Sequence, residues 1–323
     1  MLFSSLARSV SKAGSWKEEA GGKRTRIEVR RFAGPARYAK TMSPVRVAHL
    51  TDLHVGRVTP FAVQREAQAL VNAEKPDLVV VTGDFVCHSQ LYLDQLTHLM
   101  EGFSAPVVAV LGNHDYWAGA EEVAQALRRA GVEVLRNQHT TFTVRGQPLQ
   151  LVGVDDAYTG HAQCEKAVAG LRRDLPSLAL SHIAEEADHL WRYGIPLVLS
   201  GHTHGGQITL ARLHEITLGR IGGHKYLHGL YGSRDANDNG GAVYVGAGIG
   251  AAVMPVRIGE RGKREITMFE LGVSPGQFVE HHEEQEPMPG RLVSSEKLQR
   301  RIDKVDRNRA RRANRDTVQI RIG

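Results

Sequence analysis

Between residues 45 and 200 the sequence alternates short apolar runs with stretches of helical periodicity. This alternation constrains the fold most, because strands that alternate with helices form crossover units around a parallel sheet. We therefore expect an α/β domain with a buried, largely parallel central sheet. The expected strands are 45–50, 78–81, 107–111, 132–135, 141–144, 149–154, 178–180 and 197–199, and the expected helices are about 61–72, 91–100, 120–130, 162–171 and 184–193.

After residue 207 the pattern changes to glycine-rich pieces of β type, joined by a long polar loop over residues 211–241. Loops of that length inside a domain are usually functional or mobile. A stretch with three prolines then precedes a densely basic end. We predict four segments: a basic arm that is disordered or amphipathic, a main domain, a linker and a basic C-terminal tail, over residues 1–43, 44–272, 273–290 and 291–323.

The net charge of +6 is unevenly distributed along the chain. Residues 1–50 carry +8 and residues 291–323 carry +7, whereas residues 51–290 carry −9. An acidic body disfavours a nucleic-acid groove across the main domain. The basic ends instead suit an anionic surface, either a membrane or a nucleic acid. The sequence indicates no protein partner.

Cysteine content and hydropathy bear on the compartment. Cys87 and Cys164 are too few for a disulfide framework, which favours a reducing environment. No apolar run approaches the roughly 20 residues that span a bilayer. Four apolar residues among the first ten could form one face of an amphipathic helix, and a transit peptide is the alternative. We expect a cytoplasmic protein, with peripheral contact at the inner face of the membrane as an option.

The segment Gly-His-Thr-His-Gly-Gly-Gln at residues 201–207 directly follows the last expected strand of this rhythm. Because His202 and His204 are two residues apart, both rings project to one side of an extended segment. Two imidazoles in a glycine-rich loop provide half of a site for a divalent metal. Histidines that merely cap a strand are the alternative, which the rest of the pattern disfavours.

Four earlier strands also end in polar residues. Ligand-binding groups of an open α/β sheet gather at the carboxyl ends of its strands, so these side chains should converge. A set of seven donors exceeds a single tetrahedral site and suits two metals about 3.5–4 Å apart, with one carboxylate bridging. The seven donors are Asp52, His54, Asp84, Asn113, His182, His202 and His204.

These motifs resemble those of the calcineurin-like metallophosphoesterases, whose pattern is D-x-H, G-D, G-N-H-[DE], H and G-H-x-H. The match extends over about residues 45–271. The resemblance implies a four-layer αββα sandwich of two mixed sheets flanked by helices, and two divalent ions such as Mn, Zn or Fe. It further implies that Asp84 bridges the ions and that two sets of three residues hold one ion each: Asp52, His54 and His204, and Asn113, His182 and His202.

The resemblance also implies the reaction, in which a metal-bridging hydroxide attacks a phosphodiester or pyrophosphate bond. His114 would protonate the leaving oxygen or stabilise the transition state, and Asp115 would orient His114. A noncatalytic scaffold with the same fold and a nuclease that uses the basic ends are the alternatives. The presence of His114 disfavours the first, and the acidic body disfavours the second.

A narrower resemblance concerns the substrate. Gly229-Leu230-Tyr231 and Pro255-Val256-Arg257 match a branch that includes membrane-associated phosphodiesterases and resembles UDP-2,3-diacylglucosamine pyrophosphatases. A phosphoester in a lipid-linked nucleotide sugar is the implied substrate. We predict that Arg257 and His228 contact it, Arg257 because it follows a glycine-rich turn and can bind phosphate. The branch's usual H-x-P is replaced here by His182-Ile-Ala-Glu.

Overall fold

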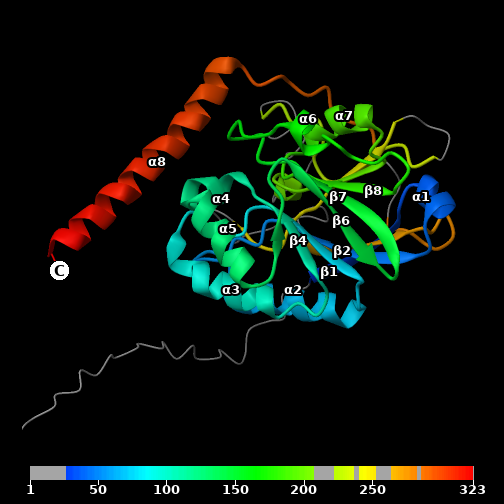
Figure 1. Cartoon of the computed structure of the whole chain (residues 1–323), viewed down its shortest axis with the longest axis horizontal. Coiled ribbons are helices and arrows are strands. Elements are labelled where there is room, and N and C mark those ends of the chain that lie inside the picture. The colour runs from blue at the N-terminus through cyan, green and yellow to red at the C-terminus, as the bar shows by residue number, and fades with distance from the viewer. Residues whose placement is uncertain (1–26, 207–221, 236–239, 252–262, 282–284, 323) are drawn as a thin grey trace, which may run out of the picture.

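In the computed structural model, two six-stranded mixed sheets pack face to face between helices (Figure 1). The structure describes residues 27–206, 222–235, 240–251, 263–281 and 285–322. The strands are β1 Ile27–Ala33, β2 Val45–Leu50, β3 Leu78–Thr82, β4 Val107–Val110, β5 Glu133–Val134, β6 Gln138–Val144, β7 Gln147–Gly153, β8 Ser177–Leu180, β9 Leu197–Ser200, β10 Gly229–Gly232, β11 Ala242–Val245 and β12 Arg264–Leu271. The α-helices are α1 Ala36–Thr41, α2 Phe61–Glu74, α3 Leu93–Glu101, α4 Asn113–Ala118, α5 Ala120–Arg129, α6 Cys164–Ala167, α7 Ala187–Leu190 and α8 Ser295–Ile322.

The strand order is β1-β12-β2-β3-β4-β5 in the first sheet and β10-β11-β9-β8-β7-β6 in the second. Strands β2 to β5 are parallel neighbours, as are β7, β8, β9 and β11. The antiparallel pairs are β12 with β2, β10 with β11, and β6 with β7. The four-layer αββα prediction is therefore confirmed, and the expected parallel strands are divided between two sheets rather than gathered in one.

The apolar runs of the sequence are buried on both faces of each sheet. In β3, Leu78 and Val80 join a cluster between the two sheets, together with residues of β8 and β9. Val79 and Val81 point the other way, into a cluster with residues of α2, α3 and α5. Alternation of the two faces along a strand explains why β3 is a continuous apolar run and not an alternating one.

The first sheet begins at Ile27, inside the range that sequence analysis assigned to the basic arm. Strand β1 pairs in parallel with β12 along its whole length. Its arginine content concealed it, because Arg30 is buried in an ion pair with Glu265 at 3.0 Å and does not face water. The arm interpretation is therefore corrected for residues 27–43, while residues 1–26 lie outside the described part.

Other elements after residue 160 also differ from expectation. The predicted helix 162–171 reduces to α6, which ends at Ala167 with Val168 as its C-cap, and Gly170 in the following turn has a left-handed φ of 86°. The predicted helix 184–193 is broken into α7 and two flanking 3-10 turns. Strand β10 was not predicted because its Gly-Leu-Tyr-Gly sequence has low strand propensity. The β-type piece at 207–210 lies outside the described residues.

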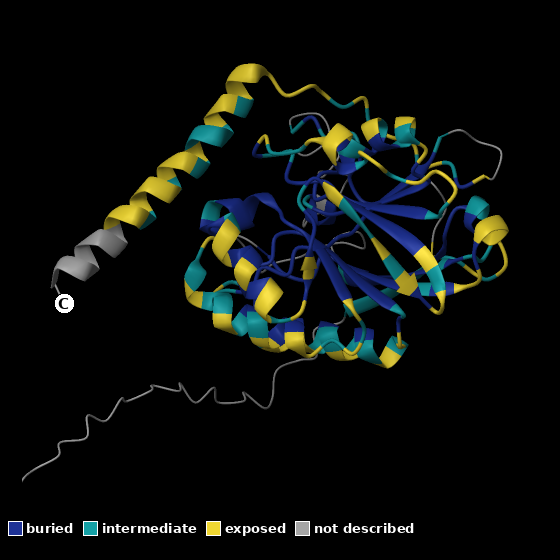
Figure 2. Cartoon of the chain, viewed as in Figure 1, coloured by how far each residue is buried: buried dark blue, intermediate teal, exposed yellow. Residues whose placement is uncertain are grey.

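The basic C-terminal segment forms the long helix α8, which passes beside α4 at the surface of the domain (Figure 1). Most of its described side chains are exposed (Figure 2). Among the described residues, no helix combines the length and the apolar character that a membrane crossing requires.

Candidate metal centre

The predicted ligands follow five strands that end at one rim of the two sheets. Backbone hydrogen bonds tie the loops after these strands to one another. Asp52 N donates to Gly83 O at 3.0 Å, and His54 N donates to Asp84 O at 2.9 Å. The packing of the two sheets thus brings side chains up to 152 positions apart in the sequence into contact, as in Asp52 and His204.

Asp52, His54, Asp84 and His204 form the first half of the centre. Their donor atoms lie within 4.8 Å of one another, and all four residues are buried. Nε2 of His204 lies 3.1 Å from Nε2 of His54 and 3.3 Å from Oδ1 of Asp52. Nε2 of His54 lies 3.5 Å from Oδ2 of Asp84.

His182 and His202 lie on the other side of Asp84. Nε2 of His182 lies 3.5 Å from Oδ1 of Asp84 and 3.3 Å from Nδ1 of His202. The backbone that carries Asn113 is tied to the same carboxylate, because N of the next residue, His114, donates to Oδ1 of Asp84 at 2.8 Å. The two oxygens of Asp84 therefore face two different groups of nitrogen donors.

Divalent cations fit this donor set. Oδ1 of Asp52 and Oδ1 of Asn113 are buried and find no hydrogen-bond partner in the part of the chain that the structure describes, which is costly unless another group binds them. Two imidazole nitrogens that face each other at 3.1 Å, as in His54 and His204, can share at most one proton. Cations coordinated by these lone pairs would satisfy both features.

Backbone conformation at the rim is also unusual. Left-handed φ angles are uncommon for residues other than glycine and are concentrated at functional sites. Five of the predicted ligands have them, with values between 44° and 75°: Asp52, His54, Asp84, His202 and His204. The loops thus hold their donors in conformations that the surrounding structure must enforce.

Two glycines permit this close packing. Gly83 has a left-handed φ of 89°, and a Cβ there would lie 2.7 Å from Nδ1 of His182. A Cβ at Gly201 would overlap the side chain of Thr51 and lie 2.5 Å from Oδ2 of Asp52. The glycines of the Gly83-Asp84 and Gly201-His202 motifs therefore leave room for ligand side chains.

The electrostatics of the centre reflect its buried carboxylates. Burial opposes ionisation of Asp84, yet His182 and His114 outweigh burial and hold the pKa of Asp84 well below its ordinary value. Burial also opposes the charge on His182, but Asp84 raises the pKa of His182 to about 10. Burial lowers the pKa of His114 to about 3. The carboxylates thus create the negative potential that attracts cations.

His114 lies at the edge of the centre. Its Nε2 is 3.9 Å from Oδ2 of Asp84, and its ring centroid is 4.1 Å from that of His88 and 4.7 Å from that of Trp117. Its Nδ1 has no hydrogen-bond partner among the described residues. His114 is thus held by ring contacts at a position beside the ligands.

Asp115 does not have the contact that sequence analysis gave it. Its two oxygens accept hydrogen bonds from the backbone N–H groups of Gly112, Asp84, Phe85 and Val86 at 2.8–3.2 Å. They are therefore committed to the loops after β3 and β4 and not to the ring of His114. Burial, followed by repulsion from Asp84, raises the pKa of Asp115 to about 7. Asp115 joins two ligand-bearing loops and does not orient His114.

The two predicted substrate contacts have different outcomes. His228 is 1% exposed, and its Nε2 lies 3.0 Å from Glu265 and 3.3 Å from Arg30. A side chain so enclosed makes structural contacts with Glu265 of β12 and Arg30 of β1 in place of the predicted substrate contact. Arg257 lies outside the described residues.

Sequence analysis missed the aromatic and cationic rim of the site. The ring centroid of Tyr158 lies 5.0 Å from that of His202, and Trp117 contacts His114. Arg301 and Lys304 of α8 lie over Tyr158 and Trp117, with the charged groups 3.6 Å and 3.3 Å from the ring centroids. Trp117 directly follows the Gly-Asn-His-Asp-Tyr segment and could have been considered. The α8 contacts had no local indication.

Comparisons with known proteins agree with this geometry. The calcineurin-like phosphoesterase family model matches residues 45–206. Phosphodiesterase YaeI of Escherichia coli is 32% identical over 239 residues, which cover 71% of this chain and 83% of YaeI. The uncharacterized metallophosphoesterase YkuE of Bacillus subtilis is 29% identical over 232 residues, covering 70% of this chain and 78% of YkuE. LpxG of Chlamydia trachomatis, a UDP-2,3-diacylglucosamine pyrophosphatase, is 28% identical over 214 residues, covering 51% of this chain and 65% of LpxG.

Two facing sheets with carboxylates and imidazoles at a common rim define a metal-dependent phosphoester hydrolase. The chain belongs to the calcineurin-like phosphoesterase family.

Proposed function

We propose that the protein hydrolyses a phosphodiester or pyrophosphate bond with two divalent ions, for which Mn, Zn and Fe are the candidates. The observation that carries this proposal is the position of Asp84, whose Oδ2 faces His54 and whose Oδ1 faces His182, each at 3.5 Å. A carboxylate between two nitrogen groups suits a bridging role. The proposed ligand sets are Asp52, His54 and His204 for one ion, Asn113, His182 and His202 for the other, and Asp84 for both.

When bound, two such cations supply a hydroxide near neutral pH and polarise the phosphoryl oxygens. The protein's own side chains complete the chemistry. His114, beside the ligands and 8% exposed, is placed to donate a hydrogen bond or a proton to the leaving oxygen. Its contacts with His88 and Trp117 keep the ring at the edge of the centre.

The test is hydrolysis of bis-p-nitrophenyl phosphate by the purified protein after loading with Mn, Zn or Fe. We expect activity that chelation abolishes and metal restores. His204→Ala should lower kcat/KM by roughly 100-fold or more, because cations contribute several kcal/mol to such reactions. His98→Ala on the exposed side of α3 is the matched control and should keep the parent activity. No activity with any of these metals would contradict the proposal.

For the physiological substrate we propose a phosphoester in a lipid-linked nucleotide sugar. The similarity to LpxG supports a pyrophosphate bond, and the similarity to YaeI supports a phosphodiester. A noncatalytic scaffold is not favoured, because the family's ligands and His114 are gathered in one place. Comparison of UDP-N-acetylglucosamine with an acylated analogue would test the lipid requirement: equal rates would contradict it.

We also propose that the basic ends of the chain contact an anionic membrane. Helix α8 carries exposed arginines such as Arg307 and Arg309, and residues 1–26 add further positive charge. Binding to vesicles with 30% phosphatidylglycerol, but not to neutral vesicles, is the expected result. Tighter salt-dependent binding to oligonucleotides than to such vesicles would favour the nuclease alternative instead.

A further inference from the structure

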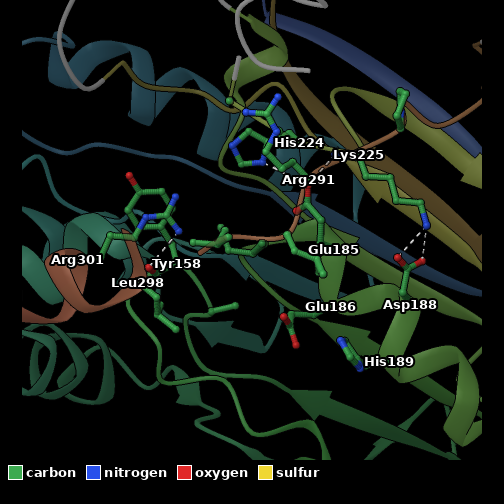
Figure 3. Close-up of a pocket in the computed structure, with 18 residues that line it drawn as sticks. Tyr158, Glu185, Glu186, Asp188, His189, His224, Lys225, Arg291, Leu298 and Arg301 are labelled. Carbon is green, nitrogen blue, oxygen red and sulfur yellow. Dashed lines mark hydrogen bonds and ion pairs between the residues drawn. The ribbon is translucent and has the colours of Figure 1, made fainter. Parts of the chain in front are cut away.

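A cavity of about 550 Å³ lies beside the candidate metal centre. Tyr158 and His224 line it, and their ring centroids lie 5.0 Å and 5.2 Å from that of His202 (Figure 3). A cavity of this volume accommodates a group much larger than one phosphoryl group. It is therefore placed to receive the part of the substrate that adjoins the scissile phosphate on the His202 side.

Helix α8, which lies beyond the segment matched by the family model, forms one wall of this cavity. It is docked on the domain along one face. Ile302 packs on Gly160, where an added Cβ would lie 3.0 Å from its Cδ1, and Val305 packs against the cluster under the first sheet. Arg312 Nη1 donates to Trp117 O at 2.8 Å. Contacts spaced by three, four or seven residues fix which side chains face the cavity.

Arg301 is the cation that this docking directs into the cavity wall. Its guanidinium carbon lies 3.6 Å from the ring centroid of Tyr158, and Figure 3 shows the two side chains together. Its Nη1 has a long contact of 3.5 Å with Tyr158 O, and its Nε is buried with no hydrogen-bond partner from the described segments. Among the described residues Arg301 has no ion pair, whereas the neighbouring Arg300 pairs with Glu296. Arg301 thus presents an oriented guanidinium with donors still available.

The acidic side chains of the cavity are already committed elsewhere. Oε1 of Glu185 accepts from Lys225 N at 2.9 Å, and Asp188 accepts from Lys225 Nζ at 2.8 Å. Glu186 accepts from Cys164 Sγ at 3.1 Å. These neutral donors leave Glu185 and Glu186 charged, but Figure 3 shows all three carboxylates on the side of the cavity away from Tyr158. The charged group beside Tyr158 is the guanidinium of Arg301, and an anionic ligand group complements it.

We propose that Arg301 of α8 binds a second phosphoryl group of the substrate, adjacent to the phosphorus atom that is attacked, and thereby selects substrates with two phosphoryl groups over simple phosphodiesters. This inference rests on the proposed function. A planar guanidinium suits the role because it donates two parallel hydrogen bonds to a phosphoryl group. Arg301 is a specificity-determining residue: the bond cleavage itself takes place at the metal centre.

Two phosphonates test the proposal as competitive inhibitors of bis-p-nitrophenyl phosphate hydrolysis at one fixed metal concentration. Methylphosphonate carries one phosphonyl group, and methylenediphosphonate carries two. The quantity compared is the inhibition constant of methylphosphonate divided by that of methylenediphosphonate. In Arg301→Gln this ratio should fall about 10- to 100-fold, because a charge-assisted contact to the second group is lost. Arg301→Lys should give an intermediate ratio. Arg300→Gln, one residue away and exposed, should keep the parent ratio.

The same ratio is measured without turnover by calorimetric titration of each phosphonate into the metal-loaded protein. This arm separates the two proposals, because a protein that hydrolyses nothing can still discriminate between the two ligands. An unchanged ratio in Arg301→Gln, or an equal change in Arg300→Gln, would overturn the assignment of Arg301. If the metal-loaded parent hydrolyses no phosphoester but still shows the expected difference in binding ratio from Arg301→Gln, the proposed function alone would be overturned.

Discussion

Replacement of Asp115 by asparagine tests whether this carboxylate holds the ligand-bearing loops through their backbone N–H groups or orients the ring of His114. Asp115 is 0% exposed and accepts four backbone hydrogen bonds. Oδ1 binds Phe85 N at 2.8 Å and Val86 N at 3.2 Å, and Oδ2 binds Asp84 N at 3.0 Å and Gly112 N at 2.9 Å. Asparagine has one oxygen and one amino group, so two of the four N–H groups would face another donor.

The expected loss follows from those two groups. A buried donor left without an acceptor costs about 1–3 kcal/mol, so Asp115→Asn should lower the free energy of unfolding by about 2–6 kcal/mol. Urea unfolding of the metal-free protein, followed by far-UV circular dichroism, measures this change. Metal-free protein is used so that altered metal affinity does not enter the comparison.

Asp94→Asn on the exposed face of α3 is the matched control and should change the free energy of unfolding by less than about 1 kcal/mol. The opposite outcome is equally specific. If Asp115→Asn unfolds with the parent's free energy and loses kcat in step with His114→Ala, then Asp115 acts through the histidine and the structural interpretation is refuted.

Three further predictions concern other parts of the molecule. His114→Ala should lower kcat by about 10²- to 10⁴-fold without loss of bound metal, measured by steady-state kinetics and elemental analysis, and a parallel loss of metal would make it a ligand instead. Gly201→Ala should displace Asp52 and lower metal affinity at least about 10-fold, measured by chelator competition, and an unchanged affinity would show that the loop can relax. The pKa of Glu265 lies well below its ordinary value of 4.5, because His228 and a buried arginine outweigh the effect of burial. The ionised Glu265 therefore makes its full contribution to the free energy of unfolding above about pH 4.5. Below that pH the contribution decreases by about 1.4 kcal/mol per pH unit as the pH falls toward the lowered pKa. Glu265→Gln should be about 3–5 kcal/mol less stable at pH 7 in urea unfolding, and a variant as stable as the parent would contradict the buried ion pair.

Much of the site was predictable because its ligands are local to strand ends. A run such as Leu78–Thr82 identifies a buried strand by itself, and Gly83-Asp84 directly follows it. The carboxyl ends of parallel strands meet at one edge, so the order of the motifs implies their convergence without any knowledge of long-range contacts. The expected helices α2, α3 and α5 likewise have clear amphipathic periodicity.

The rest depends on pairings that no local pattern encodes. From the sequence alone, strand β1 is interpreted as a basic segment, because the residue that pairs with Arg30 is Glu265, more than 200 positions away. His228 is likewise interpreted as a loop histidine from the sequence, whereas in the structure its Nε2 lies 3.0 Å from the same carboxylate. Asp115 is adjacent to His114 in sequence, but helix α4 begins there and directs the carboxylate back to the loop N–H groups. Each of these depends on a tertiary contact that overrides the local interpretation.

The buried sheets supply the free energy that keeps the strained loops of the site in their conformations. Asp52, His54 and Asp84 have left-handed φ angles, each of which costs of order 1–3 kcal/mol when the residue is not glycine. Neighbouring loops enforce those angles, since Asp52 N donates to Gly83 O, His54 N to Asp84 O, and Gly250 N to Asp52 O at 2.7–3.0 Å. These loops in turn end strands that are buried on both faces and supply the free energy that maintains the strain. The ligands are consequently fixed in place before any cation arrives, so little of the binding free energy is needed to order them.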